Sequence, residues 1–194
     1  MKLRCLKVVL GLAALTALAG CGDDEKVSSE EEARRAYLGL DMMVGKAMDL
    51  GFAGFNAASS ANIPPQTTAG TVKGTLNITG QVDQGSSDNK GMRLYVELID
   101  YQDDSAIKAT YATDKAALPA LNLQLKRIPD GTLTGTLVGK FNMTGDLKGA
   151  VTLNLAMSGQ LQADGTKVIR KPGTTAVTGT ATSDYGTYAV NITR

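Results

Sequence analysis

Histidine and tryptophan are absent from the 194 residues, and the two cysteines lie at positions 5 and 21. Without histidine the chain has no His-based catalytic triad, no imidazole base and no histidine ligand for a metal. Aromatic residues make up only 5% of the chain, and the formal net charge of +1 shows no excess of basic residues for nucleic acid. We therefore expect a protein that is not an enzyme, needs no cofactor and does not bind nucleic acid.

The first twenty residues have the organisation of a secretory signal. Lys2, Arg4 and Lys7 make the start basic, residues 8–17 form an apolar segment, and small residues follow. The apolar run is shorter than the roughly 20 residues that a membrane-spanning helix needs. We expect residues 1–20 to be a signal peptide that is removed.

The signal ends in Leu18-Ala19-Gly20-Cys21, which resembles the lipobox of bacterial lipoproteins. The resemblance covers the signal and one further residue. It implies cleavage between Gly20 and Cys21 and attachment of lipid to Cys21, which would make the membrane a partner of the protein. Gly22 stands where that family typically carries Asp for retention in the inner membrane. The expected location is therefore the bacterial cell envelope, at the outer membrane, facing the periplasm or the surface.

A helical pattern begins after a short lipidated tether, residues 21–27. Ser28 and Ser29 each precede a glutamate by three residues, which is the signature of a capping box. The pattern predicts one amphipathic helix over about residues 29–50, in a segment spanning 28–55. Its apolar stripe, at steps of three and four, is Ala33, Tyr37, Leu40, Val44, Ala47 and Gly51. The residues expected to stop the helix are Gly51 and Gly54.

The pattern changes to strict alternation after residue 70. Residues 56–70 contain Pro64-Pro65 among small residues and predict an extended linker. Alternating apolar and polar residues beyond it predict half-buried strands, and the short turns between them favour antiparallel neighbours. The strong series are 72–82, 92–98, 121–126, 133–143 and 151–161, and the weaker ones are 107–113, 167–170 with 176–182, and 187–193.

The expected fold is mainly β, with an N-terminal amphipathic helix followed by an antiparallel up-and-down meander of about eight strands over residues 71–194. Glycine recurs on the apolar side of these strands, where it favours strong bending. We therefore expect the sheet to curl into a barrel or half-barrel. In this class of architecture the chain resembles bacterial lipid carriers, a likeness of shape that implies no function. The glycines in question are Gly74, Gly80, Gly135, Gly139, Gly159 and Gly179.

The inside of such a sheet has the apolar character of a ligand site. The candidate ligand-lining residues are Leu76, Ile78, Leu94, Val96, Leu137, Phe141, Leu153 and Leu155. We expect a membrane-anchored envelope lipoprotein with a soluble curved β domain, non-catalytic, and either structural or able to bind a lipid or other amphiphile. In the alternative, the strands form an outer-membrane β-barrel with the apolar face towards lipid. The scarcity of aromatic residues for interfacial girdles counts against that alternative.

Two groups of polar residues resemble known sites. The segment from Ser86 to Lys90 contains Ser-x-x-Lys and Ser-Asp-Asn strings, which resemble motifs of penicillin-binding proteins and β-lactamases. Here the strings overlap in one loop and no Lys-Thr-Gly follows, so we expect no catalytic residues. Asp100, Asp103 and Asp104 are weak candidates for oxygen ligands, but their spacing is not that of an EF-hand. Asp is also common in turns, and we expect no metal site.

Overall fold

The computed structural model describes residues 25–194, so the expected signal peptide, cleavage site and lipidated Cys21 lie outside the described residues. The helices within this range are α1 (Glu30–Leu38) and α2 (Asp41–Ala57). The strands are β1 (Glu25–Lys26), β2 (Asn62–Ala69), β3 (Lys73–Val82), β4 (Lys90–Gln102), β5 (Ala109–Ala112), β6 (Ala120–Lys126), β7 (Thr132–Gly145), β8 (Leu147–Asp164), β9 (Lys167–Arg170), β10 (Ala176–Ser183) and β11 (Gly186–Thr193).

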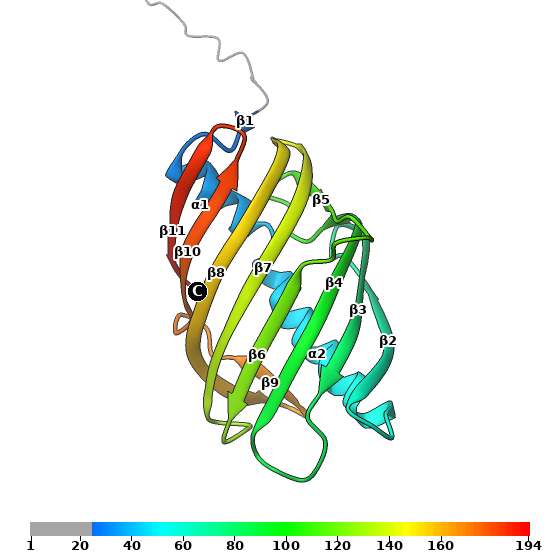
Figure 1. Ribbon diagram of the computed structural model, residues 1–194. Helices are drawn as coiled ribbons and strands as arrows, with labels where there is room; N and C mark the ends of the chain where they lie inside the picture. The colour runs from blue at the N-terminus through cyan, green and yellow to red at the C-terminus, as the bar shows by residue number, and fades with distance from the viewer. Residues whose placement is uncertain (1–24) are drawn as a thin grey trace, which may run out of the picture.

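Strand order in the sheet follows the chain (Figure 1), running β2-β3-β4-β5-β7-β8-β10-β11 with antiparallel neighbours. β5 and β6 share one position, because each pairs with β4 on one side and with β7 on the other. β9 folds back on the end of β8, and β1 adds to the start of β8 in parallel. The structure confirms the predicted mainly β fold. An N-terminal helical segment comes first in the chain, and an antiparallel up-and-down meander follows it.

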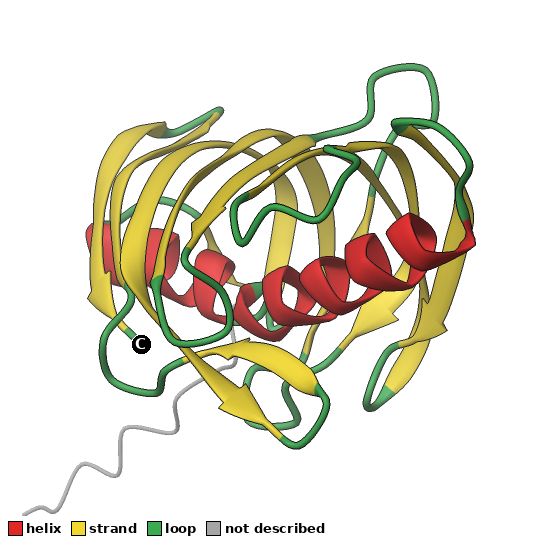
Figure 2. Cartoon of the chain, turned by 90° about the horizontal axis from the view of Figure 1, so that it is seen from below, coloured by secondary structure: helices red, strands yellow, loops and turns green. Residues whose placement is uncertain are grey.

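The sheet curls into a half-barrel, and the helices lie across its open side (Figure 2). β2 and β11 are the two ends of the strand order in the described chain. α2 contacts β2, β3, β4 and β9, whereas α1 contacts β8 and β11. The helices therefore bridge the two edges of the sheet. No helix within residues 25–194 is long and apolar enough to cross a membrane.

The hydrophobic core lies between the helices and the concave face of the sheet. All eight candidate ligand-lining residues are at most 1% exposed and belong to one buried cluster with Met43, Val44 and Met48 of α2. The opposite face of the same strands is polar, for example at exposed Thr134, Asn154 and Thr178. Side chains of α2 thus occupy the hollow of the sheet.

Two helices replace the single helix expected over residues 29–50. α1 ends at Leu38 and α2 begins at Asp41, with Gly39 between them. The ring of Tyr111 packs so closely on Gly39 that a Cβ atom there would overlap its hydroxyl group. The same hydroxyl donates a hydrogen bond to the carbonyl oxygen of Ala36 at 3.0 Å. The apolar spacing continues across this break, so the periodicity does not reveal it.

The expectation that Gly51 and Gly54 end the helix is also wrong, since α2 continues to Ala57. A Cβ atom at Gly51 would lie 2.8 Å from the sulfur of Met92, and one at Gly54 would lie 2.8 Å from Cδ1 of Ile63. These glycines therefore serve the close approach of the helix to the sheet and do not terminate the helix.

The segment 56–70, expected to be a linker, contains the strand β2. The pairing of β2 with β3 shifts register between Ile63 and Gln66, so Pro64 and Pro65 lie in a bulge. Proline is tolerated at bulges and on edge strands, because there its missing N–H group breaks no ladder hydrogen bond. The prolines that suggested a linker therefore mark the edge of the sheet.

The end of the expected tether belongs to the folded domain. Glu25 and Lys26 pair with Leu147 and Lys148 of β8. Val27 is 1% exposed, and its carbonyl oxygen accepts a hydrogen bond from the Ser183 hydroxyl at 2.5 Å. The chain is thus fastened to the sheet from residue 25 onwards.

Candidate functional site

A groove of about 850 Å³ lies at the N-terminal end of α2. Three segments supply its walls: the start of α2, the end of β9 with the turn after it, and the end of β11. The lining residues are Asp41, Met42, Gly45, Ile169, Arg170, Lys171, Pro172, Gly173, Thr175, Thr193 and Arg194. The lining is mostly apolar, and Met42, Ile169 and Pro172 contribute to it. Met42 is 44% exposed. The groove thus combines apolar walls with access to solvent.

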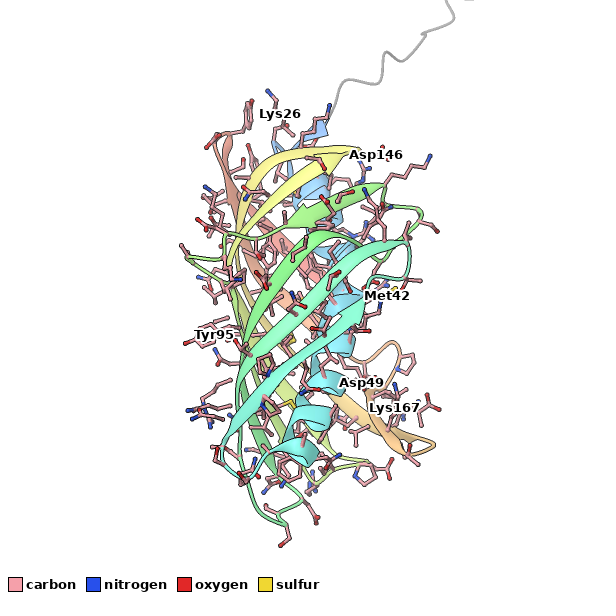
Figure 3. All side chains as sticks on the ribbon, turned by 90° about the vertical axis from the view of Figure 1, so that its right-hand side faces the viewer. Lys26, Met42, Asp49, Tyr95, Asp146 and Lys167 are labelled. Atoms are coloured by element: carbon pink, nitrogen blue, oxygen red, sulfur yellow. The ribbon has the colours of Figure 1, made fainter. Side chains whose placement is uncertain are left out.

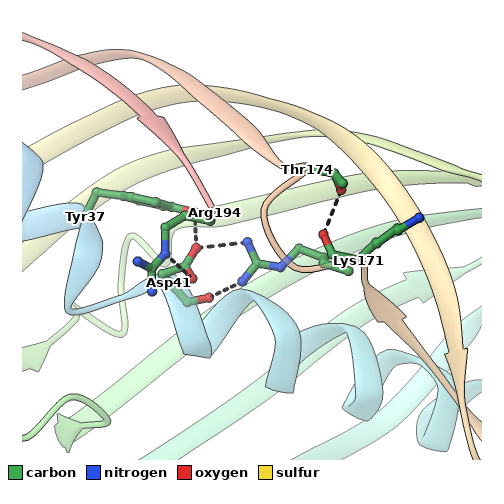
Figure 4. A network of polar contacts seen from close by, with 6 residues as sticks. Tyr37, Asp41, Lys171, Thr174 and Arg194 are labelled. Atoms are coloured by element: carbon green, nitrogen blue, oxygen red, sulfur yellow. Dashed lines mark hydrogen bonds and ion pairs between the residues drawn. The ribbon is translucent and has the colours of Figure 1, made fainter.

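One carboxylate organises the polar end of this groove (Figure 4). Asp41 Oδ1 accepts hydrogen bonds from the Tyr37 hydroxyl at 2.8 Å and from Nη1 of Arg170 at 2.9 Å. Nη2 of Arg170 donates to the main-chain carbonyl of Asp41 at 2.8 Å, and Nε of Arg194 donates to Oδ2 at 3.2 Å. The first turn of α2, the end of β9 and the end of β11 meet at this one side chain.

The pKa values of this group follow from burial and charge. Burial alone raises the pKa of Asp41, but the hydrogen bonds and charge of Arg170, together with Tyr37 and Arg194, outweigh it and lower the pKa. Burial lowers the pKa of Arg170, and Asp41 outweighs that effect and raises it. Burial and the neighbouring Asp41 charge raise the pKa of Tyr37. At neutral pH the group therefore holds one carboxylate and two guanidinium ions.

Positive charge exceeds negative charge at the rim of the groove. The side chain of Arg170 is only 14% exposed and is paired with Asp41. The side chain of Arg194 is 44% exposed and makes one hydrogen bond to Asp41. Lys171 is exposed on the turn after β9, beside Thr174, whose hydroxyl donates to the Lys171 carbonyl at 2.7 Å. Arg194 thus presents an exposed guanidinium group at the groove, whereas the Lys171 side chain points away from Asp41 and Arg194 (Figure 4).

A buried hydroxyl without a partner lies in the wall of the groove. Thr175 is fully buried, and its Oγ1 has no hydrogen-bond partner among the described residues. Its main chain pairs with that of Arg194, with N–O distances of 2.7 and 2.8 Å. A Cβ atom at Gly159 would lie 2.8 Å from this hydroxyl oxygen, so the glycine allows Thr175 to pack closely against β8. Unpaired buried hydroxyl groups are rare in folded proteins, because each has lost its hydrogen bonds to water.

Two further ion pairs hold α2 along its length. Lys46 reaches the buried carboxylate of Asp103 at 2.6 Å, and Asp49 meets Lys167 at 2.6 Å. Figure 3 shows the pair of Asp49 and Lys167 between the helix and the β9 hairpin. Grooves of about 290 and 420 Å³ lie beside this second pair. None of the candidate ligand-lining residues lines any of these three grooves.

The three aspartates considered as metal ligands do not converge. Asp103 accepts hydrogen bonds from Lys46, Tyr101 and the Thr71 amide, which outweigh the effect of burial and lower its pKa. Asp104 accepts from the main chain of its own turn, and Asp100 is exposed with a positive φ of 46°. No group of three acidic side chains within residues 25–194 is arranged to hold a metal ion.

Residues 86–89 lie in the loop between β3 and β4, and Lys90 is the first residue of β4. Lys90 is buried, its ammonium donates to the carbonyl oxygen of Gly85 at 2.5 Å, and it lies 4.6 Å from the centre of the Phe55 ring. The Ser87 hydroxyl accepts from the Asn89 amide at 3.1 Å. These contacts give the loop and its lysine a structural explanation.

The residues that build the groove were not predicted as a site. Asp41 and Arg170 are separated by 129 residues, and no motif connects them. Comparison of the chain with protein-family models, curated proteins and solved structures finds no match. The assignment of the site therefore depends on its residues and geometry.

Proposed function

We propose that the chain is a lipoprotein of the bacterial cell envelope, held at the outer membrane by lipid on Cys21, whose curved β domain binds an amphiphile without catalysing a reaction. The observation that carries this proposal is the mostly apolar groove with a cationic rim beside α2. Its volume of about 850 Å³ lies in the range of ligand sites, roughly 300–1,000 Å³. Such sites typically combine apolar walls with a few polar groups that orient the ligand.

The attachment of β1 to the sheet supports a position close to the bilayer. Glu25 already pairs with β8, and it follows Cys21 by four residues. Four residues span at most about 14 Å. A lipid on Cys21 would therefore hold the end of the domain that carries Lys26 and Asp146 (Figure 3) near the membrane surface.

The apolar face of the sheet points inwards and its polar face points outwards. This arrangement favours a soluble domain over the alternative of a membrane-embedded barrel. Leu137, Leu153 and Leu155 face the helices, whereas Asn154 and Thr178 face outwards. A bilayer-spanning barrel needs an apolar outer face, because hydrocarbon cannot satisfy polar side chains. The threonine- and asparagine-rich outer face suits water.

Metabolic labelling with a palmitate analogue tests the anchor. We expect label on the wild-type chain and on a Cys5→Ser variant, which retains the lipobox cysteine, and none on Cys21→Ser. Equal labelling of all three chains would overturn the assignment of Cys21.

Mass spectrometry of organic extracts tests binding. The Cys21→Ser chain, purified without detergent, should carry an extractable amphiphile. Gly45 lines the groove, and a Cβ atom at this position would meet nothing within 4 Å. A Gly45→Phe variant should therefore fill the groove and lose the extracted species. Extracts without an amphiphile, or extracts unchanged by Gly45→Phe, would contradict binding at this site.

A further inference from the structure

We propose that the groove selects an amphiphile with a hydrocarbon chain and an anionic headgroup, and that Arg194 binds the headgroup. This inference rests on the proposed function, because it specifies the ligand of the same groove. The shared chemistry is that of a carboxylate or phosphate ester joined to a hydrocarbon chain.

The charges at the rim give the first argument. Asp41 supplies one negative charge, and the buried Arg170 is bound both to its carboxylate and to its carbonyl oxygen. Arg194 uses only Nε in its hydrogen bond to Asp41, so its two terminal nitrogens have no partner among the described residues. The rim therefore presents a half-exposed guanidinium group whose terminal nitrogens can donate hydrogen bonds to a ligand. Arg binds carboxylate and phosphate oxygens in a fork geometry, and such charge-assisted hydrogen bonds are short and strong.

The unpartnered hydroxyl gives the second argument. Thr175 Oγ1 is buried in the wall beside the main chain of Arg194. A hydroxyl group left without an acceptor costs free energy. An oxygen of the headgroup seated at Arg194 would supply this acceptor, so the same ligand accounts for the free guanidinium nitrogens and for the hydroxyl.

The apolar walls give the third argument. Met42, Ile169 and Pro172 line the same groove. Burial of a hydrocarbon chain against these side chains removes apolar surface from water, which favours binding. Because Met side chains are flexible and adapt to irregular shapes, Met42 suits the contact with an acyl chain.

Calorimetric titration of the Cys21→Ser chain with three probes of equal chain length tests the proposal. The probes are dodecanoate, dodecyl phosphate and dodecyl maltoside, each below its critical micelle concentration. We expect at least one anionic probe to bind tenfold or more tightly than the neutral maltoside, and its affinity to fall with added salt. The stronger of the two anions distinguishes a fatty acid from a phosphate-bearing lipid.

Variants of the protein distinguish contacts with the headgroup of the probe from contacts with its hydrocarbon chain. Arg194→Gln should weaken the anionic probe about fivefold or more and leave the maltoside unchanged. Met42→Ser should weaken every probe that binds. Lys140→Gln, which removes an exposed cation from β7 outside the groove, is the matched control and should change nothing.

Two results would overturn the proposal in different ways. If charged and neutral probes bind equally and Arg194→Gln has no effect, amphiphile binding stands but the selection of anions is wrong. If none of the three probes binds, the proposed function fails with it.

Discussion

Arg170 binds Asp41 twice, through the carboxylate at 2.9 Å and through the main-chain carbonyl at 2.8 Å. The two side chains are 14% and 7% exposed. The contact joins the β9 hairpin to the first turn of α2, and it leaves Arg194 as the second cation on the same carboxylate. The pair therefore fixes the position of the helix and shapes the rim of the groove.

Removal of this pair should destabilise the fold. Replacing Arg170 by Met leaves a largely buried carboxylate without its main partner, so we expect the free energy of unfolding to fall by about 3 kcal/mol in urea titrations. The matched control is Arg93→Met, which breaks the exposed pair with Asp83 and should cost less than about 1 kcal/mol. Equal losses in the two variants would show that the Arg170 contact contributes no more than a surface pair.

Two glycines of the helical segment should respond oppositely to alanine. At Gly39 a Cβ atom would overlap the Tyr111 hydroxyl, so Gly39→Ala should destabilise the protein by about 1–3 kcal/mol. At Gly45 a Cβ atom meets nothing within 4 Å, and Gly45→Ala should stabilise helix α2 by about 0.5–1 kcal/mol. Thermal unfolding measures both changes. A destabilised Gly45→Ala variant would mean that this part of the helix is not as open as described.

Stability should depend on pH only in acid and not near neutrality. The pKa values of Asp41 and Asp103 are lower in the folded chain than in the unfolded chain, because Arg170 and Lys46 respectively help to outweigh burial. The stabilisation is complete above the unfolded pKa of about 3.9 and is lost as pH falls through the lower folded values. Because the chain has no histidine, we expect a constant free energy of unfolding between about pH 5 and 8.

Urea titrations at several pH values measure this profile. Asp103→Asn should be less stable than wild type at pH 7 and should lose less stability on acidification. A fall of stability between pH 7 and 5 in the wild-type chain would contradict the prediction.

The proposed lipid anchor on Cys21 should hold one end of the domain close to the bilayer. If Cys21 is the lipidated residue, the processed chain has no free thiol, because Cys5 is removed with the signal. A single cysteine introduced at Asp146 or at Ser87 can then carry a fluorophore. We expect headgroup-located quenchers to quench the label at Asp146, near β1, several times more than the label at Ser87, in the loop between β3 and β4 (Figure 1). Equal quenching would argue against this orientation.

Alternation of apolar and polar residues predicts most of the sheet, because an antiparallel sheet with one buried face imposes a period of two. The same reasoning fails at β2, where Pro64 and Pro65 conceal an edge strand, and at Gly39, where a tyrosine 72 residues away interrupts a helix. In both places a tertiary contact overrides the local pattern.

The groove is not predictable from the sequence for a related reason. Asp41 is one polar residue on a helix, and Arg170 and Arg194 are single cations on strand ends. What makes them a site is their meeting across the fold, and the unpartnered hydroxyl of Thr175 appears only when its surroundings are known. The eight inward-facing residues chosen from the sequence are buried, but the packing of α2 leaves them in the core.

The partners of Asp41 also bear on how the chain folds. They lie 129 and 153 residues further along the chain. Helix α2 is synthesised early and therefore acquires these partners among the last. Contacts so distant in sequence require costly loop closure and slow the search for the native state. Until they form, the edges of β2 and β11 lack their helical cover and can pair with other chains. The arrangement that places a cationic groove beside α2 therefore prolongs the interval in which the nascent domain is vulnerable to aggregation.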